Sequence, residues 1–511
     1  AEGKDSDTAA VSTITGSGVY NIVGDIRAAD GGILTLDLAE GSRFEGKAVL
    51  DSGNDSQSTL TMAKNSLWTL TGNSQLNSLQ NEQSVIDMTG DNKAFSTLSV
   101  ETLTGNGGTI IMDIDGSQVD ASDKIYVTGD FSGSHTLSLK EINGLDSDPG
   151  IGQAAENTVL ASVNGSGTFT ADDQEGTLYW QRYELGQKDS AASGYTTDWY
   201  LKGITNLNLP TTSVEAIAAS GALAYHTWRD HDQLLQRLGD LRQHGREEEG
   251  VWVRVKGGKL SRSDQFEFEN KYTQYELGYD QKLKSTPAYT RYAGISFSYL
   301  DGDSSYSSGS GENKVKALNI YGTQIGAKGH YLDLVLKYSQ LDNDFKVFDT
   351  SGNKITGDYD QNGLSISAEY GRKNNLKNNW YIEPQAQLTF GRLRGTDYTT
   401  SNGIRVDQDG IDSFVGRIGF NIGKDINEKT NIYLKANLMH EFGGGYNASM
   451  VDAGGTKARL DRDFDDTWFE YGLGAAVQTG KNNYFYVDVE RSAGSDYKKD
   501  WQWNVGARWS F

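Results

Sequence analysis

The sequence contains no cysteine and only 4 prolines among its 511 residues. The absence of cysteine excludes a disulfide framework and metal sites built on thiolates. Long hydrophobic runs are also missing, because no stretch approaches the roughly 20 apolar residues that a membrane-spanning helix needs. If this chain crosses a membrane, it does so as a closed β-barrel, whose strands satisfy one another's backbone hydrogen bonds. The mean hydropathy of -0.57 is compatible with such strands, because their side chains alternate between apolar and polar.

Basic residues are scarce in the first 205 residues, which carry 11 basic and 29 acidic side chains, or -18 of the net charge of -22. Such an acidic segment repels polyanions, so nucleic acid is not an expected partner. Histidine is equally scarce there: only His135 is present, and a Ser-His-Asp triad would depend on it. We expect no cofactor and no metal. The remainder of the chain carries only -4, which places a domain boundary near residue 205.

The last eleven residues alternate between two kinds of side chain. One set is Trp501, Trp503, Val505, Ala507, Trp509 and Phe511, and the other is Gln502, Asn504, Gly506, Arg508 and Ser510. A period of two predicts a strand. An aromatic face opposite a polar face is typical of a strand between lipid and a hydrated lumen. Taken alone, the segment is also compatible with an edge strand of a soluble sheet.

Eleven further alternating segments precede this one. The twelve predicted strands run near 250–261, 270–283, 288–300, 313–326, 330–342, 362–373, 379–394, 411–423, 430–442, 465–479, 484–492 and 500–511. Their connections alternate between short turns, such as 327–329, and long loops at 343–361, 395–410 and 443–464. This alternation is the pattern of an outer-membrane barrel. Pro384 falls inside a predicted strand, so we expect a bulge there.

The first 204 residues consist of strand-length runs separated by turn residues. In residues 1–90 the pattern suits either a sandwich or a parallel β-helix, and periodicity does not decide between them. Residues 91–204 contain more aromatics, and a β-helix needs such a capped end to protect its open edge. Residues 205–212 are expected to form a polar linker. Ser213 can then cap a helix that continues to about Arg242.

That helix carries several small residues in succession. They are Ala216, Ala218, Ala219, Ser220, Gly221 and Ala222. A helix with its side chains is about 10–12 Å across, and small residues suit a narrow channel such as the lumen of a twelve-stranded barrel. The alternative is an amphipathic helix packed on a soluble core.

Several short motifs carry a family resemblance. They are RLGDLR at 237–242, GVWVRVKGG at 250–258, YELGYDQ at 275–281, WYIEPQAQL at 380–388, GRIGF at 416–420, KANLMHEF at 435–442, WFEYGLG at 468–474, VDVE at 487–490 and the terminal GARWSF. In this order and spacing, the chain resembles a classical (type Va) autotransporter of the AIDA/pertactin-like group.

The resemblance implies an all-β fold in four parts. These are right-handed parallel β-helix rungs of a passenger at 1–90, an autochaperone-like cap at 91–204, a linker and lumenal helix at 205–249, and a 12-stranded antiparallel outer-membrane barrel at 250–511. The barrel would be monomeric and would display the passenger on the surface of a Gram-negative cell. Expected partners are outer-membrane lipid, the barrel-assembly machinery, periplasmic chaperones and a ligand on a host or neighbouring cell.

The passenger is then expected to be an adhesin that acts in adhesion, aggregation or biofilm formation, rather than an enzyme. Two alternatives stay open. An enzymatic passenger domain could lie upstream of this sequence, or the chain could be a plugged outer-membrane channel.

Alternation also assigns charged side chains to the lumen, because an Arg or Lys facing lipid at mid-membrane costs ~2–4 kcal/mol. The predicted contacts of the lumenal helix are Arg254, Glu276, Asp333, Glu369, Glu383, Arg417, Glu441, Glu470, Glu490 and Arg508. The resemblance adds two further expectations. Trp503, Val505, Trp509 and Phe511 would form the signal for barrel assembly, and self-cleavage would involve Asn206 or Asn208 with Glu276, although the Asn-Asn junction of the Asn-cleaving subgroup is absent.

Overall fold

The computed structural model describes residues 10–51, 55–90, 94–142, 155–238, 249–480 and 482–511. The chain divides into two compact units, Ala1–Thr211 and Thr212–Phe511.

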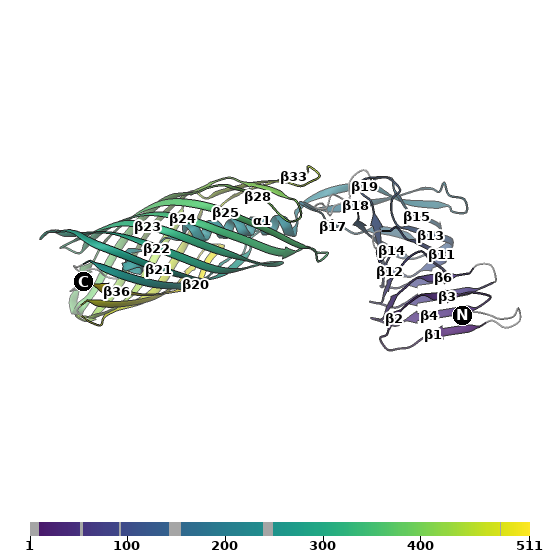
Figure 1. Cartoon of the computed structure of the whole chain (residues 1–511), viewed down its shortest axis with the longest axis horizontal. Helices are drawn as coiled ribbons and strands as arrows, with labels where there is room; N and C mark the ends of the chain where they lie inside the picture. Colours follow the sequence, from purple (N-terminus) through teal and green to yellow (C-terminus); the bar gives the residue numbers. More distant parts are fainter. Residues whose placement is uncertain (1–9, 52–54, 91–93, 143–154, 239–248, 481) are drawn as a thin grey trace. The chain divides into compact units, whose positions relative to one another are not determined.

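Short strands build the first unit. They are β1 (Val11–Ile14), β2 (Asn21–Val23), β3 (Ile26–Ala28), β4 (Ile33–Leu38), β5 (Arg43–Glu45), β6 (Ala48–Leu50), β7 (Gln57–Met62), β8 (Leu67–Thr69), β9 (Ser74–Asn81), β10 (Val85–Asp87), β11 (Thr97–Thr104), β12 (Asn106–Ile114), β13 (Lys124–Phe131), β14 (Ser134–Glu141), β15 (Val159–Gly165), β16 (Thr168–Ala171), β17 (Gln174–Glu175), β18 (Tyr179–Asp189) and β19 (Thr197–Pro210). One sheet runs β1-β4-β7-β9-β11-β13-β15 and another β2-β5-β8-β10-β12-β14-β16, with parallel neighbours (Figure 1). Parallel stacking of successive coils makes this unit a β-helix and excludes the antiparallel sandwich.

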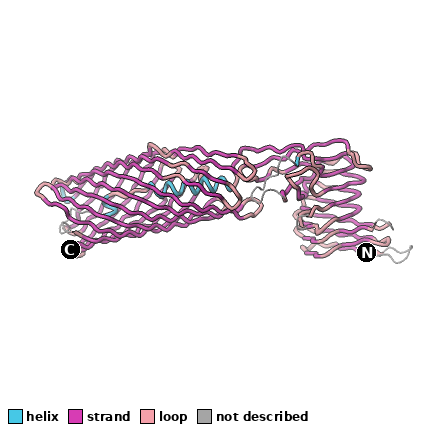
Figure 2. The backbone as a smooth tube through the Cα atoms, turned by 45° about the horizontal axis from the view of Figure 1, so that its top comes forward, coloured by secondary structure: helices cyan, strands magenta, loops and turns pink. Residues whose placement is uncertain are grey.

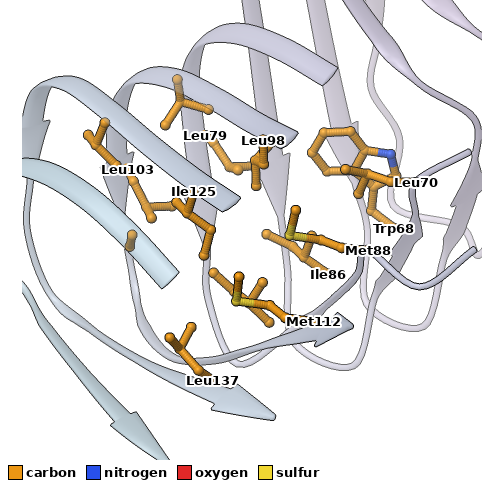
Figure 3. Packing of buried hydrophobic residues seen from close by; sticks show 14 of the residues in the cluster. Trp68, Leu70, Leu79, Ile86, Met88, Leu98, Leu103, Met112, Ile125 and Leu137 are labelled. Carbon is orange, nitrogen blue, oxygen red and sulfur yellow. The ribbon is translucent and has the colours of Figure 1, made fainter. Parts of the chain in front are cut away.

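Apolar side chains form ladders inside the coils. Leu36 pairs with Leu60, Leu60 with Leu79 and Leu79 with Leu103, and all four are fully buried. Figure 3 shows Leu79 and Leu103 within this core. The paired leucines are 24, 19 and 24 residues apart, because the turns between strands differ in length. Each coil therefore stacks on the next through the same ladder of buried leucines, while the length of the surface turns varies from coil to coil.

The β-helix closes with antiparallel strands. Parallel pairing continues beyond residue 90, as far as β15 and β16. There β15 pairs antiparallel with β19, which pairs with β18, and β18 with β17. The expected linker at 205–212 is wrong, because β19 continues to Pro210. Its residues find partners in β18, where Gln181 pairs with Asn206 and Tyr179 with Pro210.

Long antiparallel strands build the second unit. They are β20 (Gly250–Arg262), β21 (Phe268–Ser285), β22 (Tyr289–Tyr306), β23 (Gly309–Gly326), β24 (His330–Phe348), β25 (Lys354–Arg372), β27 (Trp380–Leu393), β30 (Ile411–Asn427), β31 (Thr430–Glu441), β34 (Asp466–Gln478), β35 (Asn483–Ala493) and β36 (Tyr497–Ser510). Because β20 pairs with β36 and β25 with β27, the twelve strands close into a barrel, as predicted. Apolar side chains such as Leu334 and Leu336 face outward, whereas Asp333 is buried inside.

Three expectations about the barrel need correction. The loop expected at 343–361 is an extension of β24 and β25, which pair until Phe348 meets Lys354. The other long connections contain β28 (Thr396–Thr399), β29 (Arg405–Gln408), β32 (Gly445–Val451) and β33 (Lys457–Asp463), which form a separate four-stranded sheet. The bulge expected at Pro384 is also wrong. Pro384 pairs with Phe420 in β30 without a register shift. On its other side, the ladder between β27 and β25 ends at the neighbouring residue Gln385, so Pro384, which has no N–H group to donate, lies beyond the end of that ladder.

The predicted helix is interrupted. It consists of α1 (Thr212–Arg229) and the short α2 (Leu234–Leu238), and both lie inside the ring of strands (Figure 2). Residues 230–233 between them are not helical, and 239–242 lie outside the described residues. No helix in the described part of the chain is long and apolar enough to cross a bilayer. The last two small elements, β26 (Asn374–Asn375) and η2 (Lys377–Asn379), occupy the turn between β25 and β27.

Candidate functional site

The candidate site is the lumen of the barrel with the segment inside it, residues 212–238, here called the plug. From Ser213 to Arg229 every described side chain of α1 except Glu215 is buried. Ser220 hydrogen-bonds the Tyr359 hydroxyl at 2.8 Å, and Asn402 donates to the Ser213 hydroxyl at 2.9 Å. Small residues suit this position because the wall side chains come close to the helix backbone.

The break between the two helices carries two carboxylates. Lys256 lies 3.1 Å from both Asp230 and Asp232, and Lys499 lies 3.2 Å from Asp230. Arg254 donates to Asp232 at 2.5 Å. These carboxylates reach the wall cations because the chain leaves the helical path at Asp230. A buried charge is costly without a partner, so pairing explains the interruption.

Lys337 contributes to the same break. Its ammonium group donates to the backbone carbonyls of Trp228 at 3.4 Å and Asp230 at 3.3 Å. The last carbonyls of a helix have no partner within the helix, and a cation there also interacts favourably with the helix dipole. Lys337 therefore caps the end of α1 from the barrel wall.

The short helix α2 is anchored by its own set of contacts. Arg237 donates to both carboxylate oxygens of Asp333, at 2.8 and 2.7 Å. The Leu234 N–H donates to Glu369 at 2.8 Å, and Gln236 donates to Glu490 at 2.9 Å. Hydrogen bonds with an ionised partner are stronger than neutral ones, so these contacts fix α2 to β24, β25 and β35.

Of the ten predicted lumenal residues, the structure places five in direct contact with the plug. These five are Arg254, Asp333, Glu369, Glu441 and Glu490. The others bond within the wall: Glu276 to Arg254, Glu383 to Gln385, Arg417 to Gln387, Glu470 to Lys499 and Arg508 to Asp280.

Several contacts of the plug lie outside the set predicted from the sequence. Lys256 lies two residues after Arg254 and shares its inward parity, whereas Lys499 lies nine residues before Arg508 and enters the lumen because the β20–β36 ladder shifts register between Lys259 and Leu260. Asp230 and Asp232 were counted as part of a continuous helix. Parity predicts the inward position of Lys256 but not that of Lys499, and no local signal separates Asp230 from an ordinary exposed helix residue.

Inward aromatic rings cover glycines of adjacent strands. The pairs are Trp252 on Gly278, Tyr321 on Gly294, Tyr331 on Gly371, Tyr381 on Gly423, Tyr433 on Gly474 and Tyr486 on Gly506. At each glycine an added Cβ would lie within 2.4 Å of the ring, for example 2.0 Å at Gly506. All six glycines lie toward the strand ends opposite the long loops. Together the rings narrow that end of the lumen.

The residues of the predicted assembly signal lie on the outer face of β36 and just beyond it. Phe511 is 62% exposed and Trp509 40%, with Val505 similarly exposed and Trp503 half-buried. The Phe511 N–H donates to the Glu249 carbonyl at 3.0 Å. Their part in assembly stays a prediction.

The residues considered for self-cleavage belong to different units. Asn206 and Asn208 lie in β19, where Asn206 pairs with Gln181. Glu276 lies in β21 and is bonded to Arg254, Ser296 and Asn319. Self-cleavage by this set stays a prediction.

His135, the histidine of the first unit, does not face solvent. Its ring stacks on Phe131 and lies close to Phe169, and it is 1% exposed. Burial lowers the pKa of His135 to about 4. The ring is thus a neutral core residue and not an accessible base.

The fold and the lumen define a class of protein: a transmembrane β-barrel closed by its own plug, preceded by a β-helix. Comparisons with known proteins agree with this class. The family described as "Autotransporter beta-domain" matches residues 251–490, and the family described as "Pertactin" matches residues 76–203. The barrel thus matches an autotransporter β-domain, and the β-helix is similar to the pertactin family. The barrel is embedded in the bacterial outer membrane as a monomeric unit, and the β-helix is a passenger exposed at the cell surface.

Several curated relatives match nearly the whole chain. The "Probable autotransporter YcgV" of Escherichia coli (strain K12) is 28% identical over 99% of this chain and 55% of that protein. The "Pertactin autotransporter" of Bordetella bronchiseptica is 29% identical over 95% of this chain and 56% of that protein. The "Serine protease pet autotransporter" of Escherichia coli O44:H18 is 26% identical over 89% of this chain and 34% of that protein. The chain thus spans about half the length of the first two.

Among solved structures, the β domain of the Bordetella autotransporter BrkA is similar to part of this chain. It is 27% identical, with a TM-score of 0.45, and the match covers 52% of this chain and all of that chain.

Proposed function

We propose that the passenger is an adhesin and that the plugged barrel anchors it at the surface. The observation that carries this proposal is the form of the first unit. Stacked coils with a buried apolar ladder leave a long polar exterior, which suits weak contacts repeated along a surface. The one histidine of this unit is buried among aromatic rings, so the unit offers no histidine as an accessible base.

The test compares cells that display the chain with cells that display only the barrel. A non-adherent host strain would produce either the full chain or a variant without residues 10–204, at matched amounts of barrel in the outer membrane. We expect the full chain to promote aggregation or attachment to host cells, and the variant to lose both. Equal attachment by the two strains would contradict an adhesin role for this passenger.

The second candidate is an autotransporter with an enzymatic domain upstream of this sequence. It is favoured by the similarity to the serine protease autotransporter of Escherichia coli. Sequencing the gene upstream of Ala1 discriminates the two. Further coils rich in Gly, Thr and Asn would support the adhesin, whereas a His, Asp and Ser set would support the protease.

The proposal includes the partners that export requires. Outer-membrane lipid surrounds the outward apolar side chains, and the barrel-assembly machinery with periplasmic chaperones delivers the chain. The ligand of the passenger lies on a host or neighbouring cell. A channel function is the remaining alternative; it predicts a steady ion conductance of the intact chain in planar bilayers, which the plug would prevent.

Residues 91–204 are proposed to promote folding of the passenger by capping its open end. Their removal should leave barrel insertion intact and lower the yield of protease-resistant passenger, because an uncapped coil exposes unpaired backbone groups. Display of protease-resistant residues 10–90 at wild-type levels would contradict this role.

A further inference from the structure

Arg229, the last residue of α1, is surrounded by aromatic rings inside the barrel. The guanidinium carbon lies 4.5 Å from the ring centroid of Trp468, 5.1 Å from that of Tyr497 and 5.4 Å from that of Tyr225. The side chain is only 4% exposed. Among the described residues, Glu441 is the carboxylate paired with it, with 3.6 Å between Nη1 and Oε2.

This arrangement differs from an ordinary arginine salt bridge. Arginine usually presents its planar fork to a carboxylate and forms short parallel hydrogen bonds. Arg262 does so with Asp264, through Nε at 2.8 Å and Nη2 at 2.5 Å. Among the described residues Nη1 of Arg229 has no hydrogen-bond partner. The aromatic faces, with a negative charge nearby, are therefore the main contacts of this cation.

The barrel holds the side chains around Arg229 in place. Glu441 accepts hydrogen bonds from the Ser413 hydroxyl at 2.6 Å and from the N–H groups of Phe414 and Gly443 at 2.7 and 3.0 Å. The Trp468 indole N–H donates to Glu470 at 3.1 Å. Trp468, Tyr497 and Glu441 all belong to barrel strands, and α1 adds two contacts besides Arg229: Tyr225 donates to Glu441 at 2.7 Å, and the ring of His226 stacks on that of Tyr497 at 4.2 Å.

From this geometry we infer that Trp468, Tyr497 and Glu441 form a binding site for guanidinium or quaternary ammonium groups. We call these three residues the cation cage. Arg229 occupies the cage in the plugged barrel and thereby holds the end of α1. A neighbouring cavity lined by Arg229, Trp468 and Tyr497 leaves room for a small alkyl group. Free ligands of this class would therefore fill the cage when the arginine side chain is absent.

The test is chemical rescue of the full chain in detergent. Arg229→Ala empties the cage, and the probe is N-ethylguanidinium at millimolar concentration, with sodium chloride and urea as matched salt and neutral controls. We expect the variant to melt below the wild type and the probe to raise its melting temperature more than either control does. Wild type should show no such rise, because its cage is filled.

Two further variants keep the inference falsifiable. In Arg229→Ala/Trp468→Leu the affinity for the probe should fall about tenfold, or ~1.4 kcal/mol. Arg392→Ala removes an exposed arginine paired with Asp412 on the outer surface, and the probe should not rescue it. An equal rise in wild type, Arg229→Ala and Arg392→Ala would show a general effect and overturn the site.

If Arg229→Ala does not assemble in cells, the same comparison uses refolding of the full chain from urea into detergent. The probe should restore the heat-modifiable folded band of Arg229→Ala and not of Arg229→Ala/Trp468→Leu. Failure to restore the band, or equal recovery of both variants, would also overturn the inference.

Discussion

Gly221 of α1 lies directly against the ring of Tyr446 in β32, and a Cβ added there would come within 2.5 Å of the Tyr446 hydroxyl oxygen. Replacing Gly221 by Trp should therefore overpack the lumen and destabilise the barrel by ~1–3 kcal/mol. Glu215→Trp is the control, because Glu215 is the exposed residue of the same helix. Thermal unfolding in detergent measures both. Equal melting of the two variants would mean that this side of α1 is not confined.

Removal of residues 213–238 tests the plug as a barrier. The charged groups of the wall, among them Arg254 and Asp333, would lose their partners in the plug, and the lumen would fill with water. We expect the ionic conductance of the purified barrel to rise in planar bilayers and its melting temperature to fall. A conductance equal to that of the intact chain would contradict the position of the plug within the lumen.

Asp230 and Asp232 should contribute to stability through their cations. Asp230→Asn/Asp232→Asn leaves Lys256, Arg254 and Lys499 with fewer buried partners, and breaking a buried pair costs ~3–5 kcal/mol. The control Asp412→Asn breaks an exposed pair with Arg392, which is worth ~0–1 kcal/mol. Urea unfolding of the two variants compares these costs. A smaller loss in the double variant than in Asp412→Asn would contradict the pairing.

Phe511→Ser should impair assembly of the barrel, because it removes the terminal outward aromatic ring. Ser510→Ala is a control at the adjacent position, which faces the lumen. Assembly is measured as the heat-modifiable barrel in the outer-membrane fraction. A normal amount for Phe511→Ser would show that the terminal aromatic residue is not part of the signal.

Ionisation of the buried Asp123 carboxyl group should lower the stability of the passenger as the pH rises. Its carboxylate is buried and accepts the N–H groups of Ser96 and Asp113, at 2.6 and 2.7 Å. Burial raises the pKa of Asp123 to about 7 and that of Asp113 to about 6. An unfolded Asp titrates near 3.9. The folded state therefore binds more protons between these values, so its extra stability is present below about pH 4 and is lost as the pH rises through 6 to 7.

The measurement is protease resistance of the passenger in urea at pH 5 and pH 8, using the full chain. Asp123→Asn should reduce the difference between the two pH values, whatever its effect on absolute stability. Asp25→Asn, at an exposed carboxylate, is the control and should keep the wild-type difference. An unchanged difference in Asp123→Asn would assign the pH dependence to other groups.

The strands of the barrel and the direction of their side chains could be predicted from the sequence. Side chains alternate strictly along a strand, and the contrast between lipid and a polar lumen makes that alternation visible in residues such as Leu332, Asp333 and Leu334. A shift by one residue would expose every charge to lipid. Twelve strands and the inward position of Arg254 follow from this constraint. The small residues of α1 likewise predicted its place in a narrow lumen.

The spacing of the apolar residues in the passenger could not decide between a sandwich and a β-helix. Their paired leucines are 24, 19 and 24 residues apart, because turns on the surface vary while the core ladder does not. The extension of β19 to Pro210 was hidden for a related reason. A polar strand segment looks like a linker until its partner, β18, is known.

The break in the plug was decided by tertiary structure alone. Nothing near Asp230 in the sequence ends a helix, since it is neither proline nor glycine. Its partners Lys256 and Lys499 lie on β20 and β36, strands that become neighbours only when the barrel closes. The cation cage has the same origin, because Glu441, Trp468 and Tyr497 meet around Arg229 from three strands. Local alternation thus set which side chains enter the lumen except where the ladder shifts register, as at Lys499, whereas closure of the barrel set which of them meet.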